Sequence, residues 1–356
     1  MTLAVNIAQS GSNNATFRNR IINGAMVIAQ RGTGSTSVQT SNDYVSCDRW
    51  ISDASQNSKY TIQQSSDAPT GFNFSLLATS SSAYSVTASD GFRLQQRIEG
   101  FNTADLAFGS ASAKTVTLSF WVKSTLTGTF GGSLCNSAFN RTYPFTYTIS
   151  SASTWEQKTI TIAGDTSGTW IGATNGIGII VYFSLGAGSN FTGTNNAWNS
   201  GFYLGGSTSV VGTSGATFQI SGVQLEAGTT ASPFEYRQYG TELALCQRYY
   251  YRTKPATGSY LSSAGYMSST TVFQGFLQFP VTMRTNPTAL EQSGTAGDYR
   301  IVNQTGATIC TAVPTLADAT DILARTQFTA SGFTAGYSGT AGSANGNAYL
   351  GWSAEL

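Results

Sequence analysis

The chemistry open to this sequence is limited first by what it lacks. Its 356 residues include no histidine, which excludes a Ser-His-Asp triad, a Cys-His pair and a His-ligated zinc site. The four cysteines are Cys47, Cys135, Cys246 and Cys310. They lie far apart with no Cys-x-x-Cys pair, so we expect small buried side chains rather than a metal or redox centre. The first expectation is therefore a protein that is not an enzyme.

Catalysis by Lys, Tyr or carboxylate side chains remains possible without histidine. A glycosidase needs two acidic side chains at a set separation across the bond that it cleaves. The acids considered for such a pair are Asp165, Glu226, Glu235 and Glu242. No feature of the sequence pairs any two of them, so a polysaccharide-cleaving enzyme is kept only as an alternative.

Three aspartates, Asp43, Asp48 and Asp53, lie close together in the sequence. Calcium takes carboxylate and carbonyl oxygens as ligands, so a structural calcium site is conceivable at this point. The spacing of the three residues matches no calcium-binding loop. We therefore expect neither a cofactor nor a bound metal.

Aromatic side chains in polar, glycine-rich segments are the best candidates for ligand binding. Aromatic faces, amides and hydroxyl groups together suit the recognition of sugars. The glycan-binding candidates are Trp170, Trp198, Asn199 and Tyr203 in the first part of the chain, and Tyr260, Tyr266, Tyr337 and Tyr349 in the last part. The alternative for each ring is packing, either at the ends of a sandwich core or in the core of a trimer.

The charge and the apolar segments of the chain indicate which kinds of partner to expect. Only 10% of the residues are charged and the net charge is +1, whereas about 25% charged residues is usual. No cluster of Lys and Arg is present to neutralise phosphates, so nucleic acid is not an expected partner. The longest apolar stretch, residues 177–185, is too short to span a bilayer. No secretory signal is visible at the N-terminus, which predicts synthesis in the cytoplasm without membrane insertion.

The sequence pattern predicts that β-strands carry the candidate binding side chains. Residues 115–122 alternate apolar and polar side chains with the period of a strand. In residues 177–185 apolar side chains recur at every second position from Ile177 to Leu185, and Ile180 and Tyr182 add apolar surface on the opposite face. The alternation slips by one residue at Gly222, which predicts a β-bulge. Glycine-rich turns separate the strands, and no strand-helix-strand rhythm appears. The pattern predicts an all-β protein built on a β-sandwich or jelly roll, followed by a short helix and a second, smaller C-terminal β domain.

Four segments are expected along the chain: an extended arm over residues 1–20, the jelly-roll sandwich over 21–239, a helical connector over 240–255 and the C-terminal β domain over 256–356. Binding residues concentrate on exposed loops, and Tyr side chains among Gly and Ser suit recognition, so the C-terminal domain is the expected tip for ligand binding.

The helix is predicted to begin after Thr241 as N-cap and to end before Pro255. Its apolar face would carry Leu243, Cys246 and Tyr250, at i, i+3 and i+7.

Several segments resemble the tail-fibre and minor structural proteins of bacteriophages. They are residues 19–24 (NRIING), 30–32 (QRG), 48–50 (DRW), 119–124 (SFWVKS), 128–130 (GTF), 219–228 (QISGVQLEAG), 233–237 (PFEYR), 240–250 (GTELALCQRYY) and 351–356 (GWSAEL). The resemblance implies a jelly roll like that of carbohydrate-binding modules, a place in the virion tail and a homotrimer. It further implies that the N-terminal arm attaches to tail or baseplate proteins, and that the protein mediates host adsorption by multivalent binding of cell-surface polysaccharide. A capsid decoration or head-fibre protein remains the alternative within this family.

Overall fold

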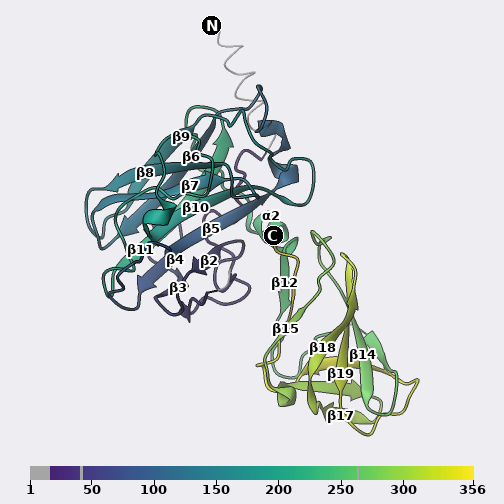
Figure 1. The fold of residues 1–356 in the computed structure, drawn as a ribbon. Coiled ribbons are helices and arrows are strands. Elements are labelled where there is room, and N and C mark those ends of the chain that lie inside the picture. The colour runs from purple at the N-terminus through teal and green to yellow at the C-terminus, as the bar shows by residue number, and fades with distance from the viewer. Residues whose placement is uncertain (1–16, 41–42, 263) are drawn as a thin grey trace. The chain divides into compact units, whose positions relative to one another are not determined.

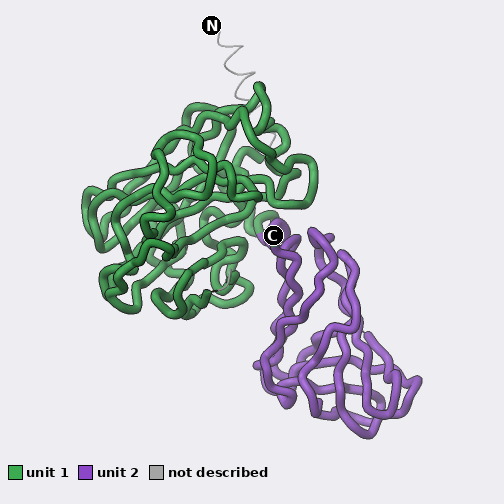
Figure 2. The backbone as a smooth tube through the Cα atoms, in the orientation of Figure 1, with its two compact units in different colours: residues 1–242, 356 green, residues 243–355 purple. Residues whose placement is uncertain are grey.

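A computed structural model of the protein describes residues 17–40, 43–262 and 264–356. These residues fall into two compact units, unit 1 within residues 1–242 together with 356, and unit 2 within residues 243–355 (Figure 2). Most of the expected N-terminal arm lies outside the described residues. Its last residues belong to unit 1, where the Arg20 backbone N–H donates to the Leu225 carbonyl at 2.9 Å.

Unit 1 consists of two antiparallel sheets (Figure 1). The six-stranded sheet has the order β1-β3-β4-β11-β6-β9, with β1 Thr36–Ser37, β3 Tyr60–Ser65, β4 Ser75–Ser80, β11 Thr217–Ala227, β6 Val116–Ser124 and β9 Glu156–Ile162. The five-stranded sheet has the order β2-β5-β10-β7-β8, with β2 Ile51–Ala54, β5 Gly91–Glu99, β10 Ile177–Ala187, β7 Gly128–Cys135 and β8 Thr142–Ile149. Three short 3-10 helices join them: η1 Gly100–Asn102, η2 Ala104–Leu106 and η3 Ser189–Phe191.

The strand order defines the fold of unit 1 as a jelly roll. Strands β4, β11, β6 and β9 form one four-stranded layer, and β5, β10, β7 and β8 form the other. The chain passes repeatedly from one layer to the other between β4 and β11, which is the double Greek key of a jelly roll. The expected jelly-roll β-sandwich is confirmed.

Alternation along the strands explains why the sandwich closes. In β6 the side chains of Val116, Leu118, Phe120 and Val122 are all fully buried in the core between the sheets. The expected bulge is present in β11, where the register against β6 shifts between Ser221 and Gln224. Gly222 has a φ of +58° there, and a Cβ atom would lie 2.6 Å from the Phe72 ring. Only glycine fits this position without strain.

Unit 2 is also built from antiparallel strands, which confirms the second, smaller β domain. Its seven-stranded sheet has the order β17-β16-β20-β13-β14-β19-β18, with β17 Gly306–Ile309, β16 Tyr299–Asn303, β20 Ser338–Ser343, β13 Ala264–Met267, β14 Val272–Gln278, β19 Leu323–Thr329 and β18 Ala312–Ala319. A three-stranded sheet has the order β12-β21-β15, with β12 Tyr250–Thr253, β21 Leu350–Ser353 and β15 Leu290–Gln292, and the 3-10 helix η4 spans Ala296–Asp298.

The helix is shorter than the sequence predicts. Helix α2 spans Tyr239–Gln247, so it ends well before Pro255, and the predicted apolar face is wrong at Tyr250. Residues 250–253 instead form β12, which pairs with β21 about a hundred residues further along the chain. Aromatic residues favour strands, and this tertiary pairing overrides the local helical pattern.

The described residues can be compared with the expectations about cysteines, metal binding and membrane insertion. All four cysteines are buried with reduced thiols, as the sequence predicts for small buried side chains. Among the described residues, no group of three His, Cys, Asp or Glu side chains could hold a metal ion. Within the same part of the chain, no helix has the length and apolar character needed to cross a bilayer.

Candidate functional site

Three of the predicted tyrosines lie beside strand β20 of unit 2. The Cα of Tyr266 pairs with that of Ser338, and Tyr260 forms an isolated bridge with Gly342. Tyr337 directly precedes β20, and its carbonyl accepts the Met267 N–H at 2.8 Å. All three rings are exposed, at 61% for Tyr260, 41% for Tyr266 and 43% for Tyr337.

The first two rings lie on the same face of the seven-stranded sheet. Residues directly opposite one another in a sheet point to the same side, as do residues two or four apart along a strand. Ser338 and Gly342 are four residues apart, so Tyr260 and Tyr266 are about 14 Å apart along β20 at 3.4 Å per residue. This spacing suits an extended ligand rather than a single small group.

Two rows of side chains continue this face across β13, β14 and β19. One row holds Tyr266, Gln274 and Gln327, and the next holds Ala264, Phe276 and Arg325. The opposite face carries the core of unit 2, which includes Met267, Phe273 and Phe328. The rows therefore form a surface of aromatic, amide and guanidinium groups, which we call the Tyr266 surface.

The centre of the Tyr266 surface combines an aromatic platform with an unused hydrogen-bond acceptor. The rings of Tyr266 and Phe276 are nearly parallel, with centroids 6.4 Å apart and 22° between their planes. Beside them the Oε1 atom of Gln274 is buried and accepts no hydrogen bond from the described residues. A buried acceptor without a donor is unfavourable, so the Gln274 amide has hydrogen-bonding capacity that the described residues leave unused.

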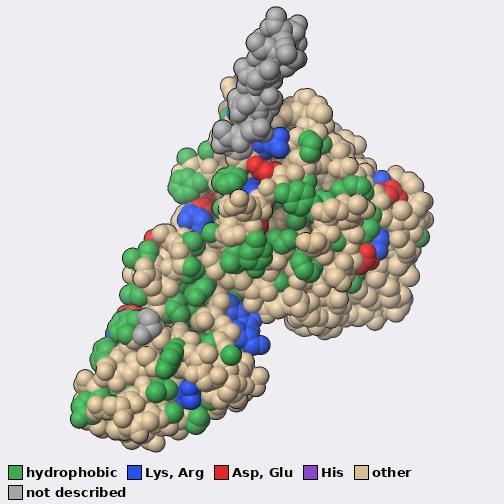
Figure 3. Space-filling view, turned by 180° about the vertical axis from the view of Figure 1, so that it is seen from behind, with side chains coloured by type: hydrophobic (Ala, Val, Ile, Leu, Met, Phe, Trp, Pro, Cys, Tyr) green, Lys and Arg blue, Asp and Glu red, His purple; other side chains and the backbone are tan. Residues whose placement is uncertain are grey.

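The Tyr266 surface is close to electrically neutral. The Arg325 guanidinium donates to Asp318 through Nε at 3.2 Å and Nη2 at 2.5 Å. The hydrogen-bonded Asp318 carboxylate raises the pKa of Arg325 above its ordinary value, and this ion pair compensates the charge of the guanidinium. Figure 3 shows that charged side chains are also sparse on the face of the protein in view.

Tyr349, another predicted candidate, belongs to a different part of unit 2. It precedes β21, and its ring lies under the Arg252 guanidinium, 3.6 Å from the ring centroid. Its carbonyl accepts the Tyr299 hydroxyl at 2.8 Å. Tyr349 is half-buried in these contacts and does not join the Tyr266 surface.

The two predicted tryptophans of unit 1 pack together at the margin of the sandwich core. The Trp170 and Trp198 rings meet edge to face at 5.4 Å, and both contact Phe108. The Trp198 indole donates to the Ala163 carbonyl at 2.8 Å, and that of Trp170 donates to the Ser167 carbonyl at 3.2 Å. Their indole N–H groups are therefore already used within the chain.

Asn199 and Tyr203 serve the same loop region. The Asn199 side chain closes its own turn, with bonds to the Thr194 backbone at 2.9 and 3.0 Å and to the Ala197 carbonyl at 2.8 Å. Tyr203 is half-buried, and its ring fills the space beside Gly193 and Gly201. These contacts organise the loop and leave the Asn199 amide committed.

The four acids considered for catalysis make structural contacts. Asp165 accepts two bonds from Arg141, at 2.7 and 2.6 Å, and Glu226 accepts the Ser232 N–H and hydroxyl at 2.8 and 2.7 Å. Glu235 and Glu242 both pair with the buried guanidinium of Arg237, at 3.4 and 3.3 Å. The contacts of these acids hold loops and strand ends of unit 1.

The sequence reasoning missed Gln274, Phe276 and Arg325. One signal was available, because Gln274, Phe276 and Gln278 recur at every second position in residues 272–278 and so share one face of a strand. Arg325 had no such signal, since its place beside Phe276 depends on the pairing of β14 with β19.

Comparisons with known proteins place the fold in context. No protein-family model and no curated protein matches the chain. Among solved structures, the chain resembles the enzymatically active domain of bacteriophage CBA120 tailspike protein 4, with 12% identity, a TM-score of 0.31, 59% of this chain covered and 21% of that one. It thus spans about a fifth of the tailspike chain. It also resembles the family 11 carbohydrate-binding module of a Clostridium thermocellum cellulase, with 13% identity, a TM-score of 0.27, and 57% and 99% of the two chains covered. TmCBM61 in complex with β-1,4-galactotriose matches with 10% identity, a TM-score of 0.31, and 60% and 100% covered.

Proposed function

We propose that this chain is a non-catalytic, glycan-binding subunit of a bacteriophage tail fibre, which adsorbs the virion to a host cell-surface polysaccharide through the Tyr266 surface of unit 2. The observation that carries the proposal is the parallel Tyr266–Phe276 platform beside the unused acceptor of Gln274. An aromatic face packs against the apolar side of a sugar ring, while the Gln274 amide oxygen accepts a hydrogen bond from a sugar hydroxyl group.

The absence of catalysis is part of the proposal. It is supported by the contacts of Asp165, Glu226, Glu235 and Glu242, each of which holds a basic or hydroxyl partner within unit 1. Incubation of the protein with host polysaccharide should release no new reducing ends. A time-dependent release that needs the intact protein would overturn this part.

Multivalency supplies the strength of adsorption. We propose a homotrimer, so that several weak Tyr266 surfaces act on one polysaccharide chain and gain roughly 10²–10⁴ in avidity when they engage together. Light scattering of the full chain should give three times the mass of one chain. A monomer at micromolar concentration would contradict the trimer.

The decisive experiment is equilibrium binding of host polysaccharide to the wild-type chain and to Tyr266→Ala. Loss of one aromatic contact of about 1 kcal/mol should weaken each site about fivefold. Tyr239→Ala is the matched control, because Tyr239 is also exposed but lies in unit 1. Equal affinity of the two variants would reject the Tyr266 surface as the site.

The place of the protein in the particle is tested separately. The tail is proposed from the family resemblance, which also assigns attachment to the arm over residues 1–20. Antibody labelling of intact particles should mark the tail. Label on the head would favour a decoration protein instead.

A further inference from the structure

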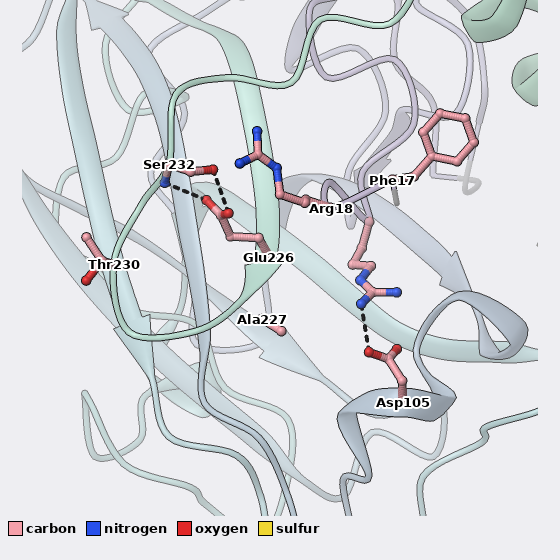
Figure 4. Close-up of a pocket in the computed structure, with 8 residues that line it drawn as sticks. Phe17, Arg18, Asp105, Glu226, Ala227, Thr230 and Ser232 are labelled. Carbon is pink, nitrogen blue, oxygen red and sulfur yellow. Dashed lines mark hydrogen bonds and ion pairs between the residues drawn. The ribbon is translucent and has the colours of Figure 1, made fainter. Parts of the chain in front are cut away.

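A pocket lies in unit 1, where the start of the described chain crosses the end of β11 and the helix η2 (Figure 4). Its volume is about 560 Å³, within the range of sites for small ligands. The lining side chains are Phe17, Arg18, Arg20, Asp105, Glu226, Ala227, Thr230 and Ser232. None of them belongs to the Tyr266 surface.

The walls of this pocket are fixed by contacts within the chain. Glu226 holds the loop after β11 through Ser232, and Arg20 donates to Asp105 at 2.8 Å and to the Asn102 carbonyl at 3.1 Å. The Arg18 backbone N–H donates to Glu235 at 3.2 Å. A ligand would therefore meet a preformed site rather than order it, which keeps the entropic cost of binding low.

Arg18 differs from the other charged groups that line the pocket. Asp105 is compensated by Arg20, with Lys114 at 3.7 Å, and Glu226 accepts three hydrogen bonds from Ser232 and Gln224. The Arg18 guanidinium makes no ion pair or hydrogen bond with another described residue. Figure 4 shows its side chain extending over the pocket on the side of Glu226 and Ser232.

We propose that this pocket binds a carboxylated sugar, such as a uronic acid residue of an acidic polysaccharide. The planar fork of Arg18 matches a carboxylate with two parallel hydrogen bonds. The hydroxyl groups of Thr230 and Ser232 and the exposed ring of Phe17 suit the remainder of the sugar. The choice of a sugar as ligand rests on the proposed glycan-binding function, whereas the choice of a carboxylate rests on Arg18.

The test is calorimetric titration of the full chain with tri-galacturonate and with the matched trisaccharide whose carboxylates are reduced to hydroxymethyl groups. The wild type should bind the acidic ligand and bind the reduced ligand much more weakly. Arg18→Gln should weaken acidic binding roughly 10- to 100-fold, the range for a charge-assisted hydrogen bond. Arg18→Lys keeps the charge but loses the fork, so it should fall between the two.

Two controls keep the result interpretable. Lys254→Gln removes one exposed positive charge from unit 2 and should leave acidic binding unchanged. The melting temperature of Arg18→Gln should equal that of the wild type, because its side chain bonds to no described residue.

Three results would overturn the proposed binding of a carboxylated sugar in this pocket. They are no binding of tri-galacturonate by the wild type, equal binding of its reduced form, or full binding by Arg18→Gln. Acidic binding that is lost in Tyr266→Ala but kept in Arg18→Gln would place carboxylate recognition on unit 2 instead. Failure of host polysaccharide to bind the Tyr266 surface would leave a positive Arg18 result intact, so the two proposals fail separately.

Discussion

The ring of Tyr266 lies nearly parallel to that of Phe276, with 6.4 Å between centroids and 22° between planes. The two residues come from neighbouring strands and sit diagonally across the pairing of β13 with β14. Phe276 is half-buried and Tyr266 is exposed. The inner ring thus limits the positions of the outer ring, so the platform is organised before a ligand arrives.

Phe276 should therefore contribute to glycan affinity through Tyr266. We expect Phe276→Ala to weaken binding about 2- to 12-fold, because an aromatic pair contributes about 0.5–1.5 kcal/mol beyond its buried area. A double-mutant cycle with Tyr266→Ala measures the coupling, and the combined loss should be smaller than the sum of the single losses. Strictly additive losses would show that the rings act independently.

Arg237 should be essential to the stability of unit 1. Its side chain is 4% exposed and lies between Glu235 and Glu242, and its Nη1 also donates to the Ile21 carbonyl at 3.1 Å. Arg237→Met would leave two acids without their cation, which should cost about 3–5 kcal/mol in the free energy of unfolding. Urea denaturation measures this.

The control for Arg237 is Lys114→Met, which removes an exposed ion pair with Asp105 from the same unit. Such a pair contributes at most about 1 kcal/mol. Equal stabilities of the two variants would refute the structural role of Arg237.

Asp90 should give unit 1 a dependence on pH. Its carboxylate accepts hydrogen bonds of 2.7–2.9 Å from Thr87, Ser55 and Tyr84. Burial disfavours the charged form, but these bonds outweigh burial and lower the pKa of Asp90 below its ordinary value of 3.8. Because the folded pKa is the lower one, the stabilisation is complete above the unfolded pKa and is lost as the pH falls through the folded pKa.

Asp90→Asn tests this dependence. At neutral pH the variant should be less stable than the wild type by about 1–3 kcal/mol, and the difference should shrink below about pH 4. Denaturation curves over this pH range measure it. A difference that stays constant down to about pH 2 would exclude Asp90 as the titrating group.

Binding at the Tyr266 surface should respond little to salt. Arg325 is compensated by Asp318, so a neutral glycan gains no net ionic attraction there. Raising the salt concentration from about 0.05 to about 0.5 M should change the affinity for neutral host fragments less than about twofold, although screening is much stronger at the higher value. A steep loss of affinity would point to a charged site.

The strands of the sandwich could be predicted where a pattern within one short segment is sufficient. Alternation in 115–122 is enough to identify β6, and the slip at Gly222 marks the bulge in β11. The helix failed for the opposite reason, because the fate of Tyr250 is decided by its pairing with Ser353. No local pattern contains that partner.

The candidate site could also be predicted only in part. Tyrosines that lie among Gly and Ser are visible in the sequence, and this composition identifies Tyr260, Tyr266 and Tyr337 as candidates. Their grouping along β20, and the addition of Gln274 and Phe276, follow from register between strands, which composition does not reveal.

The central claim is that host glycan binds the β13–β14–β20 face of unit 2. Hydrogen exchange of the full chain, with and without saturating host polysaccharide fragments, tests it most directly. The account predicts slower exchange of backbone amides in 264–267, 272–278 and 338–343, and loss of this protection in Tyr266→Ala. Protection confined to unit 1, or unchanged by that substitution, would contradict it.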